Sequence, residues 1–168
     1  RLTAAAYPAA TSENVTYSYD QVSGVKGVGR LTTIADQSGS TAYEYDGRGN
    51  PTRETRTIGG VAFVNDYVYD LADQLLQITY PSGRIVAYAR DALGRVTGVT
   101  TKQNALASPV TVVSGATYRP FGGLAGFSFG NGLVWNRGYD QDERPTAQSA
   151  AQGGTTVQDL GYGYDVKS

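Results

Sequence analysis

The sequence predicts an all-β fold built from antiparallel β-hairpins. Glycine and tyrosine are abundant, with 22 and 13 residues among 168, and such a composition favours short strands joined by tight turns. Turn signals recur about every 25 residues along the chain, which indicates a repeat architecture. No stretch combines a sustained 3.6-residue apolar pattern with helix caps, so no helix is predicted.

The clearest hairpin turn is Asp91 to Arg95. Asp91 fits the first position of a type I turn, where its carboxylate accepts a hydrogen bond from the backbone N–H two residues further on. Gly94 fits the left-handed position that closes a hairpin with a bulge. Arg95 begins the return strand, and its guanidinium is expected to reach back to Asp91. A turn of this kind predicts an antiparallel pair of strands.

A second turn at Tyr80 to Gly83, with Pro81 at its second position, makes the middle of the chain a three-stranded meander. Its predicted strands are residues 75–80, 84–90 and 95–101, each close to the usual strand length. Leu75 and Ile78 are three residues apart, and a regular strand would place them on opposite faces. Either a bulge realigns such pairs or both faces of the sheet are partly buried, and the sequence leaves both possibilities open.

The same unit recurs along the chain, as Tyr-x-Tyr-Asp or a variant of it followed by a turn. Its aspartates are Asp20, Asp46, Asp70, Asp91, Asp140 and Asp165. The interval from Asp91 to Asp140 spans two periods, so a degenerate unit is predicted at 116–122. The turn residues expected to set the register are Asp20, Asp46, Asp91, Gly49, Gly83, Gly94 and Arg95. Asp73 and Glu143 stand where the turn glycine belongs, and because non-glycine residues are uncommon in left-handed conformations, these two turns are expected to differ.

Two tyrosines at i and i+2 point to the same face of a strand, so the repeated tyrosines are predicted to pack against neighbouring strands. These tyrosines are Tyr17, Tyr19, Tyr43, Tyr45, Tyr67, Tyr69, Tyr88, Tyr162 and Tyr164. Tight hairpins are also predicted at the two Gly-Gly pairs, Gly59-Gly60 and Gly153-Gly154, and at Asn131-Gly132. No linker divides the chain, so residues 1–168 are expected to form one domain.

Composition excludes several function classes. The net charge of −1 argues against nucleic acids and anionic membranes as main partners, and no apolar run approaches the roughly 20 residues of a membrane span. Because cysteine and histidine are absent, disulfides, Cys/His metal sites and nucleophiles activated by histidine are excluded. Methionine is absent as well, so the chain is expected to be a fragment of a longer protein.

The densest acidic patch, Asp140 to Glu143, is the strongest candidate for chemistry. Glycoside hydrolysis needs two carboxyl groups about 5–10 Å apart, but Asp140 already has a turn role. The patch lacks the alternating oxygen ligands and central glycine of a calcium loop. The glycine-rich segment 24–29 precedes no helix, so a hairpin loop is expected there instead of a phosphate loop. No catalytic, cofactor-binding or metal-binding residue is predicted, and no cofactor.

The unit Tyr-x-Tyr-Asp-x-x-Gly-Arg-Leu resembles the YD repeat of the RHS proteins. Its most faithful copy runs from Pro81 through Tyr88 and Asp91 to Val99, and the segment from Tyr118 to Asp140 is similar to a variant in bacterial members. The likeness covers nearly the whole chain. The Asp-Pro sequence typical of the self-cleavage region of bacterial members does not occur here.

The resemblance implies a curved β-ribbon that is a segment of a hollow β-shell. Such shells enclose a toxic C-terminal domain in bacterial polymorphic toxins and insecticidal toxin complexes, and form part of an adhesion receptor in teneurins. The implied function is a non-catalytic shell segment, secreted or at the cell surface, and the implied origin is bacterial. Its implied partners are flanking YD-repeat segments and an enclosed cargo domain, with self-association through strand edges.

Two other functions remain open. An adhesion or carbohydrate-binding module requires exposed aromatic side chains along a shallow groove. A glycosidase-like enzyme requires two acidic side chains that converge in a cleft. Outward-pointing carboxylates at Asp140, Asp142 and Glu143 would remove the enzyme hypothesis.

Overall fold

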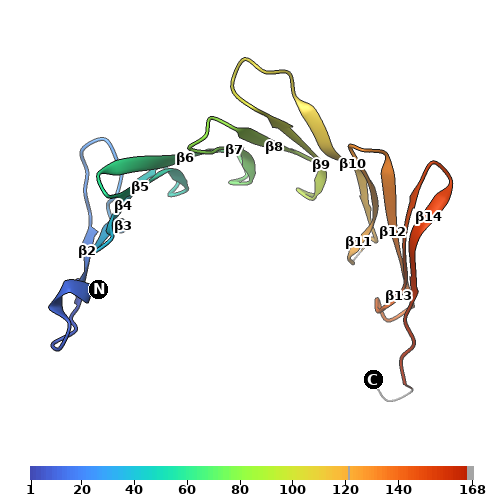
Figure 1. Ribbon diagram of the computed structural model, residues 1–168, viewed down its shortest axis with the longest axis horizontal. Coiled ribbons are helices and arrows are strands. Elements are labelled where there is room, and N and C mark those ends of the chain that lie inside the picture. Colours follow the sequence, from blue (N-terminus) through green and yellow to red (C-terminus); the bar gives the residue numbers. More distant parts are fainter. Residues whose placement is uncertain (121, 166–168) are drawn as a thin grey trace. The chain divides into compact units, whose positions relative to one another are not determined.

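The computed structural model describes residues 1–120 and 122–165. Within these ranges the chain forms fourteen strands and a three-residue 3₁₀ helix, η1 (Thr11–Glu13), so the all-β prediction is confirmed (Figure 1). The chain divides into two compact units, Arg1–Ile85 and Val86–Ser168. Within each unit the strands follow one another in chain order, and the paired neighbours are antiparallel. Such an order arises when every connection is a hairpin.

The first unit holds seven strands, β1 to β7. They are β1 (Ala4–Ala5), β2 (Val15–Tyr19), β3 (Leu31–Asp36), β4 (Gly39–Tyr45), β5 (Pro51–Ile58), β6 (Val61–Tyr69) and β7 (Leu75–Thr79). Gly59 and Gly60 connect β5 to β6, with φ angles of 56° and 81°. Positive φ at both central residues is the geometry of a two-residue turn that matches the twist of a hairpin, so this predicted turn is confirmed.

The strands β8 to β14 make up the second unit, except that β8 begins at the last residue of the first unit. They are β8 (Ile85–Arg90), β9 (Val96–Lys102), β10 (Val110–Tyr118), β11 (Leu124–Phe129), β12 (Leu133–Tyr139), β13 (Pro145–Gln152) and β14 (Thr155–Gly161). The three strands predicted around the two central turns, β7 to β9, lie within one residue of their predicted ends. Hairpins also form at the predicted Asn131-Gly132 and Gly153-Gly154 turns.

A bulge just after the turn explains the apolar residues spaced three apart. Tyr17 on β2 faces Ile34 on β3, but Tyr19 faces Leu31, so Thr32 is an extra residue on β3. The bulge brings Leu31 and Ile34 to the face that carries the two tyrosines. The pairing of β6 with β7 has the same shift and places Leu75 and Ile78 together. Of the two explanations that the sequence left open, the structure shows the bulge.

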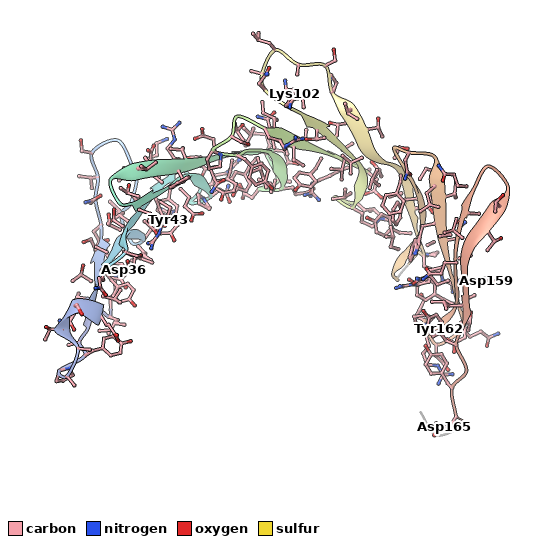
Figure 2. The ribbon with its side chains drawn as sticks, viewed as in Figure 1. Asp36, Tyr43, Lys102, Asp159, Tyr162 and Asp165 are labelled. Atoms are coloured by element: carbon pink, nitrogen blue, oxygen red, sulfur yellow. The ribbon has the colours of Figure 1, made fainter. Side chains whose placement is uncertain are left out.

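Few side chains are fully buried. The strands of each unit project side chains from both faces, and no second layer of described residues covers either face within a unit (Figure 2). The accessible surface is 10616 Å², whereas a compact protein of 17.8 kDa exposes about 8,000 Å². The buried residues among those described are Ile85, Ala116, Ala150, Thr32, Thr41, Gly27 and Gly126. Contacts along the sheet, rather than a central core, therefore hold each unit together.

Candidate functional site

The turn at Asp91 has the predicted geometry. One carboxylate oxygen, Oδ1, accepts hydrogen bonds from the backbone N–H groups of Leu93 and Arg95, both at 2.9 Å. The other oxygen, Oδ2, accepts Arg95 Nε at 2.7 Å. Gly94 has a φ angle of 81°, and its N–H donates to the Asp91 carbonyl at 3.0 Å. The aspartate therefore satisfies both the backbone of its own turn and the arginine that begins the next strand.

Asp140 and Asp46 repeat this arrangement. Asp140 Oδ1 accepts the N–H of Arg144 at 2.9 Å, and Oδ2 accepts Arg144 Nε at 2.8 Å; these bonds, beginning with the backbone one, hold the pKa of Asp140 below its ordinary value. Asn50 takes the place of the arginine beside Asp46. Its side chain and N–H, with the N–H groups of Gly49 and Arg48, lower the pKa of Asp46 to about 2 despite partial desolvation. Both carboxylates are therefore charged at neutral pH, and both are engaged in the hydrogen bonds of their turns.

Arg95 and Arg144, which follow turns, also contact the next repeat of the sequence. The Arg95 guanidinium lies over the Tyr118 ring, 4.8 Å from its centroid, and Arg144 lies over Tyr164 at 4.9 Å. The same stacking joins Arg1 to Tyr19, Arg30 to Tyr45 and Arg119 to Tyr139. In every pair the tyrosine belongs to the next repeat of the sequence. It immediately precedes the turn aspartate of that repeat or, at Tyr118, the arginine that stands in the place of the aspartate. Cation–π contacts of this kind are favourable, particularly where water is partly excluded.

Hydrogen bonds from the tyrosine hydroxyls also connect successive repeats of the sequence. Tyr118 donates to the Val96 carbonyl at 2.7 Å, and Tyr164 donates to the Pro145 carbonyl at 2.7 Å. The same bond joins Tyr19 to Leu2, Tyr45 to Leu31 and Tyr139 to Leu124. We call the combination of turn aspartate, following arginine and next-unit tyrosine the Asp–Arg–Tyr clamp. It is complete at Asp91–Arg95–Tyr118 and at Asp140–Arg144–Tyr164.

The clamp was only partly visible in the sequence. Arg95 was predicted to bond Asp91, as it does, but its contact with a tyrosine 23 residues further on was missed. The available signal was the recurrence of arginine directly after the turn at Arg30, Arg95 and Arg144. The arginine and the tyrosine recur together in the repeat. A contact between the arginine of one repeat and the tyrosine of the next would have explained this recurrence.

Replacing Tyr118 by phenylalanine is expected to destabilise the protein by about 0.5–1.5 kcal/mol, the usual net contribution of one hydrogen bond. The ring that stacks on Arg95 remains, so the loss isolates the hydroxyl bond to Val96. Urea unfolding followed by circular dichroism measures it. Tyr80→Phe is the matched control, since the described residues offer the exposed Tyr80 hydroxyl no hydrogen bond. Equal stability of the two variants would contradict the role of the clamp.

The turns at Asp73 and Glu143 correct a prediction. Both residues have a φ angle of 60°, and their N–H groups donate to the carbonyls of Asp70 and Asp140, each at 3.3 Å. These turns are thus the same as those with glycine, and the expectation that they differ was wrong. The physical reason lies in the side chains. Asp73 pairs with Arg48 Nε at 2.6 Å, and Glu143 pairs with Arg119 at 3.1 Å, so an ion pair to the preceding turn offsets the left-handed strain.

The acidic patch holds no arrangement suited to catalysis. Asp140 is committed to its turn, Asp142 pairs with Arg144 at 3.2 Å, and Glu143 pairs with Arg119. Residues 1–120 and 122–165 contain no group of three potential metal-ligating side chains. The patch therefore consists of ion-paired turn residues, and this geometry gives no support to the glycosidase hypothesis.

The glycine-rich segment 24–29 forms the loop between β2 and β3, as expected. Gly27 N–H donates to the Gln21 carbonyl at 2.8 Å, and Gly29 N–H donates to Asp20 Oδ1 at 2.6 Å. The strand β3 follows the loop, so its N–H groups do not open onto a helix N-terminus. The Asp20 carboxylate occupies donors that a phosphate would need.

The predicted packing tyrosines are half-buried in the sheet, except for two near the end of the described chain. Half-buried are Tyr17, Tyr19, Tyr43, Tyr45, Tyr67, Tyr69 and Tyr88. Tyr162 and Tyr164 are 41% and 43% exposed. Burial, together with a hydrogen bond to Glu54 at 3.1 Å, raises the pKa of Tyr67 to about 12, which fits a packed and permanently neutral hydroxyl.

One open groove of about 730 Å³ in the first unit is lined by aromatic side chains. Phe63 on β6 is 43% exposed, and Tyr80, at the turn after β7, is 39% exposed. Pro81 and Ser82 complete the same wall. This is the kind of shallow aromatic groove that the carbohydrate-binding alternative requires.

The degenerate unit predicted at 116–122 is present as a turn between β10 and β11. Arg119 N–H donates to the Gly123 carbonyl at 3.1 Å, and Tyr118 takes the clamp position. Phe121 belongs to this predicted unit but lies outside the described residues, as do residues 166–168. In residues 1–120 and 122–165 there is no helix with the length and apolarity that a membrane crossing requires.

Comparison with known proteins identifies the repeat. The family model described as RHS Repeat matches residues 27–61 and 69–105, which include the turns at Asp46, Pro81 and Asp91. Among curated protein sequences, none is significantly similar to this chain.

Solved structures share the fold. The crystal structure of TcdB2-TccC3 matches with a TM-score of 0.83 at 17% identity, over 90% of this chain and 9% of that chain. The Photorhabdus luminescens Tc holotoxin pore matches with a TM-score of 0.78 at 16% identity, over 90% and 8%. TcdB2-TccC3 without its hypervariable C-terminal region still matches, with a TM-score of 0.72 at 17% identity, over 90% and 10%. The shared fold therefore lies outside that hypervariable region.

This chain thus spans about a tenth of the length of the solved structures that it matches. The matched repeats and the all-β hairpin fold agree with the clamp geometry, in which Arg95 and Arg144 each stack on a tyrosine of the next repeat. Residues 27–61 and 69–105 of the chain are therefore RHS repeats, also called YD repeats.

Proposed function

We propose that residues 1–168 act as one non-catalytic YD-repeat segment of a longer RHS shell, and that this shell encloses a toxin or effector domain. The observation that carries the proposal is the Asp–Arg–Tyr clamp, because its bonds run from one hairpin to the next and engage the carboxylate, the guanidinium and the hydroxyl in structural contacts. A structure held by such neighbour contacts is suited to a wall.

The large exposed surface supports the same function. With few fully buried side chains, a sheet of this kind gains stability when further chain covers its faces and edges. The similarity to structures of toxin complexes supports flanking repeats and an enclosed domain as the partners. A secreted or cell-surface location is part of the proposal.

The test begins with the native protein that contains this sequence. Its mass and all co-purifying polypeptides are determined, and it is then treated with protease before and after mild denaturation. We expect flanking repeats together with a distinct domain that resists protease until the shell is opened. A chain of 168 residues that purifies alone as a stable monomer, or a distinct domain that is cleaved at once, would contradict the proposal.

A carbohydrate-binding module is the second candidate, and the groove at Phe63 and Tyr80 favours it. Aromatic faces stack against the apolar faces of sugars, and Ser82 supplies a hydroxyl at the rim. A glycan array would show specific binding that Tyr80→Ala abolishes and that Tyr162→Ala, a substitution of another exposed tyrosine, leaves intact. An array without specific binding would leave only the structural function.

A further inference from the structure

An aromatic cluster lies across two strands of the second unit, and we refer to it by its rings, Phe127, Phe129 and Trp135. The Phe127 ring contacts Phe129 edge-on at 4.8 Å between centroids, and contacts Trp135 at 5.2 Å. Phe127 on β11 and Trp135 on β12 are directly paired across the strands, so they share one face of the sheet. All three rings are only half-buried. The cluster is therefore partly open to a partner.

Arg137 lies on this same face. It is two residues from Trp135 on β12, and its guanidinium lies over the Trp135 ring, 4.9 Å from the centroid. Its Nη2 donates to Gln148 Oε1 at 2.6 Å, and Gln148 Nε2 donates to Gln158 Oε1 at 3.1 Å. Gln148 is the direct cross-strand partner of Arg137. A cation thus stands at the edge of the aromatic cluster, oriented by a neutral amide.

Arg137 differs from the arginines of the two complete clamps. Arg95 and Arg144 combine stacking on an aromatic ring with a carboxylate at 2.7 Å and 2.8 Å. Arg137 has the aromatic ring, but residues 1–120 and 122–165 supply it with no carboxylate ion pair, and its Nε is buried without a hydrogen-bond partner. A buried donor without a partner is unfavourable and calls for an explanation.

We propose that Arg137 and the aromatic cluster form a docking site for an extended, apolar polypeptide segment that carries a carboxylate. The carboxylate binds the N–H groups of Nη1, which, unlike Nε, is not among the buried unpartnered atoms, and the flanking apolar side chains cover Phe127, Phe129 and Trp135. Arginine and tryptophan beside each other are typical anchors of protein interfaces, because each contributes a large contact area and the guanidinium selects a planar anion. This site goes beyond the shell function and does not depend on it.

The positive charge of Arg137 on this face determines which kind of polypeptide segment can bind to it. Leu133 lies on the same face of β12 as Trp135 and Arg137, and the neighbouring strands β13 and β14 contribute the amides of Gln148 and Gln158 beside Arg137. A purely apolar segment would cover the guanidinium without neutralising it, and a basic segment would be repelled. A segment with one acidic residue between apolar ones satisfies both the cation and the rings.

Trp135 makes the site directly measurable, because it is the single tryptophan in the chain. The probe is an N-acetylated, C-amidated pentapeptide, Leu-Phe-Asp-Leu-Phe, and its matched control contains asparagine in place of the aspartate. We expect the aspartate peptide to change the Trp135 fluorescence saturably and to bind about 10–100-fold more tightly than the asparagine peptide. This comparison uses the unaltered chain, so it does not depend on how any variant folds.

Substitution then assigns the effect to Arg137. Arg137→Gln is expected to remove the preference for aspartate while weak binding of the asparagine peptide persists. Arg53→Gln, at an exposed arginine of the first unit that pairs with Asp66, is the matched control and should retain the full preference. Equal binding of both peptides, retention of the preference in Arg137→Gln, or an equal fluorescence change with sodium acetate alone would overturn the proposal.

Discussion

Replacing Gly39 by alanine is expected to destabilise the first unit by about 2–4 kcal/mol, combining backbone strain with overpacking. Gly39 begins β4 with a φ angle of 140°, a region that only glycine adopts readily. A Cβ there would overlap the carbonyl oxygen of Thr57 on the paired strand β5. Because backbone atoms on both sides are held in the ladder, neither strand can yield without losing hydrogen bonds.

Substitutions at two further glycines distinguish backbone strain from overpacking as the cause of the lost stability. Gly59→Ala meets no atom within 4 Å but has a φ angle of 56°, so strain alone should cost about 1–2 kcal/mol. Gly47→Ala meets no atom within 4 Å and has no positive φ, so it should be nearly neutral. Urea unfolding gives the three stabilities. A Gly39→Ala protein as stable as Gly47→Ala would show that the β4–β5 contact is looser than described.

Acid is expected to unfold the protein between about pH 4 and pH 2, because the turn aspartates must then be protonated. The pKa of Asp46 is lowered from 3.8 to about 2. The turn hydrogen bonds also hold the pKa of Asp20 and of Asp140 below the ordinary value, chiefly through backbone N–H groups. A carboxyl group with a lowered pKa in the folded state stabilises it above the unfolded pKa. That stabilisation is lost as the pH falls through the folded pKa.

The measurement is the urea midpoint as a function of pH. We expect a constant midpoint from pH 7 to pH 5 and a steep fall between about pH 4 and pH 2. Asp46→Asn should lower the midpoint at pH 7 and make the fall shallower, since one of the protonating groups is gone. Asp159→Asn, on the exposed strand β14, is the matched control for loss of a carboxylate outside the turns. A fall of unchanged steepness in Asp46→Asn would exclude the turn carboxylate as its cause.

Local features of this protein were predictable because they depend on neighbouring residues. The turn at Asp91 and Gly94 needs only a short acceptor and a residue that tolerates positive φ, and both can be recognised in the sequence. The same holds for Gly59 and Gly60 between β5 and β6. Prediction was wrong at Asp73 and Glu143, because what makes their left-handed conformation acceptable is an arginine more than 20 residues away.

The sequence by itself determined the all-β class, the hairpin turns and the RHS-type repeat, because each depends on patterns within about ten residues or on their recurrence. Only the tertiary structure decided the bulge at Thr32, the stacking of Arg95 on Tyr118 and the position of Arg137 over Trp135. These features depend on register between strands, since a shift of one residue would turn every side chain to the other face. Register is established by the sum of many cross-strand contacts, which no single segment of the sequence contains.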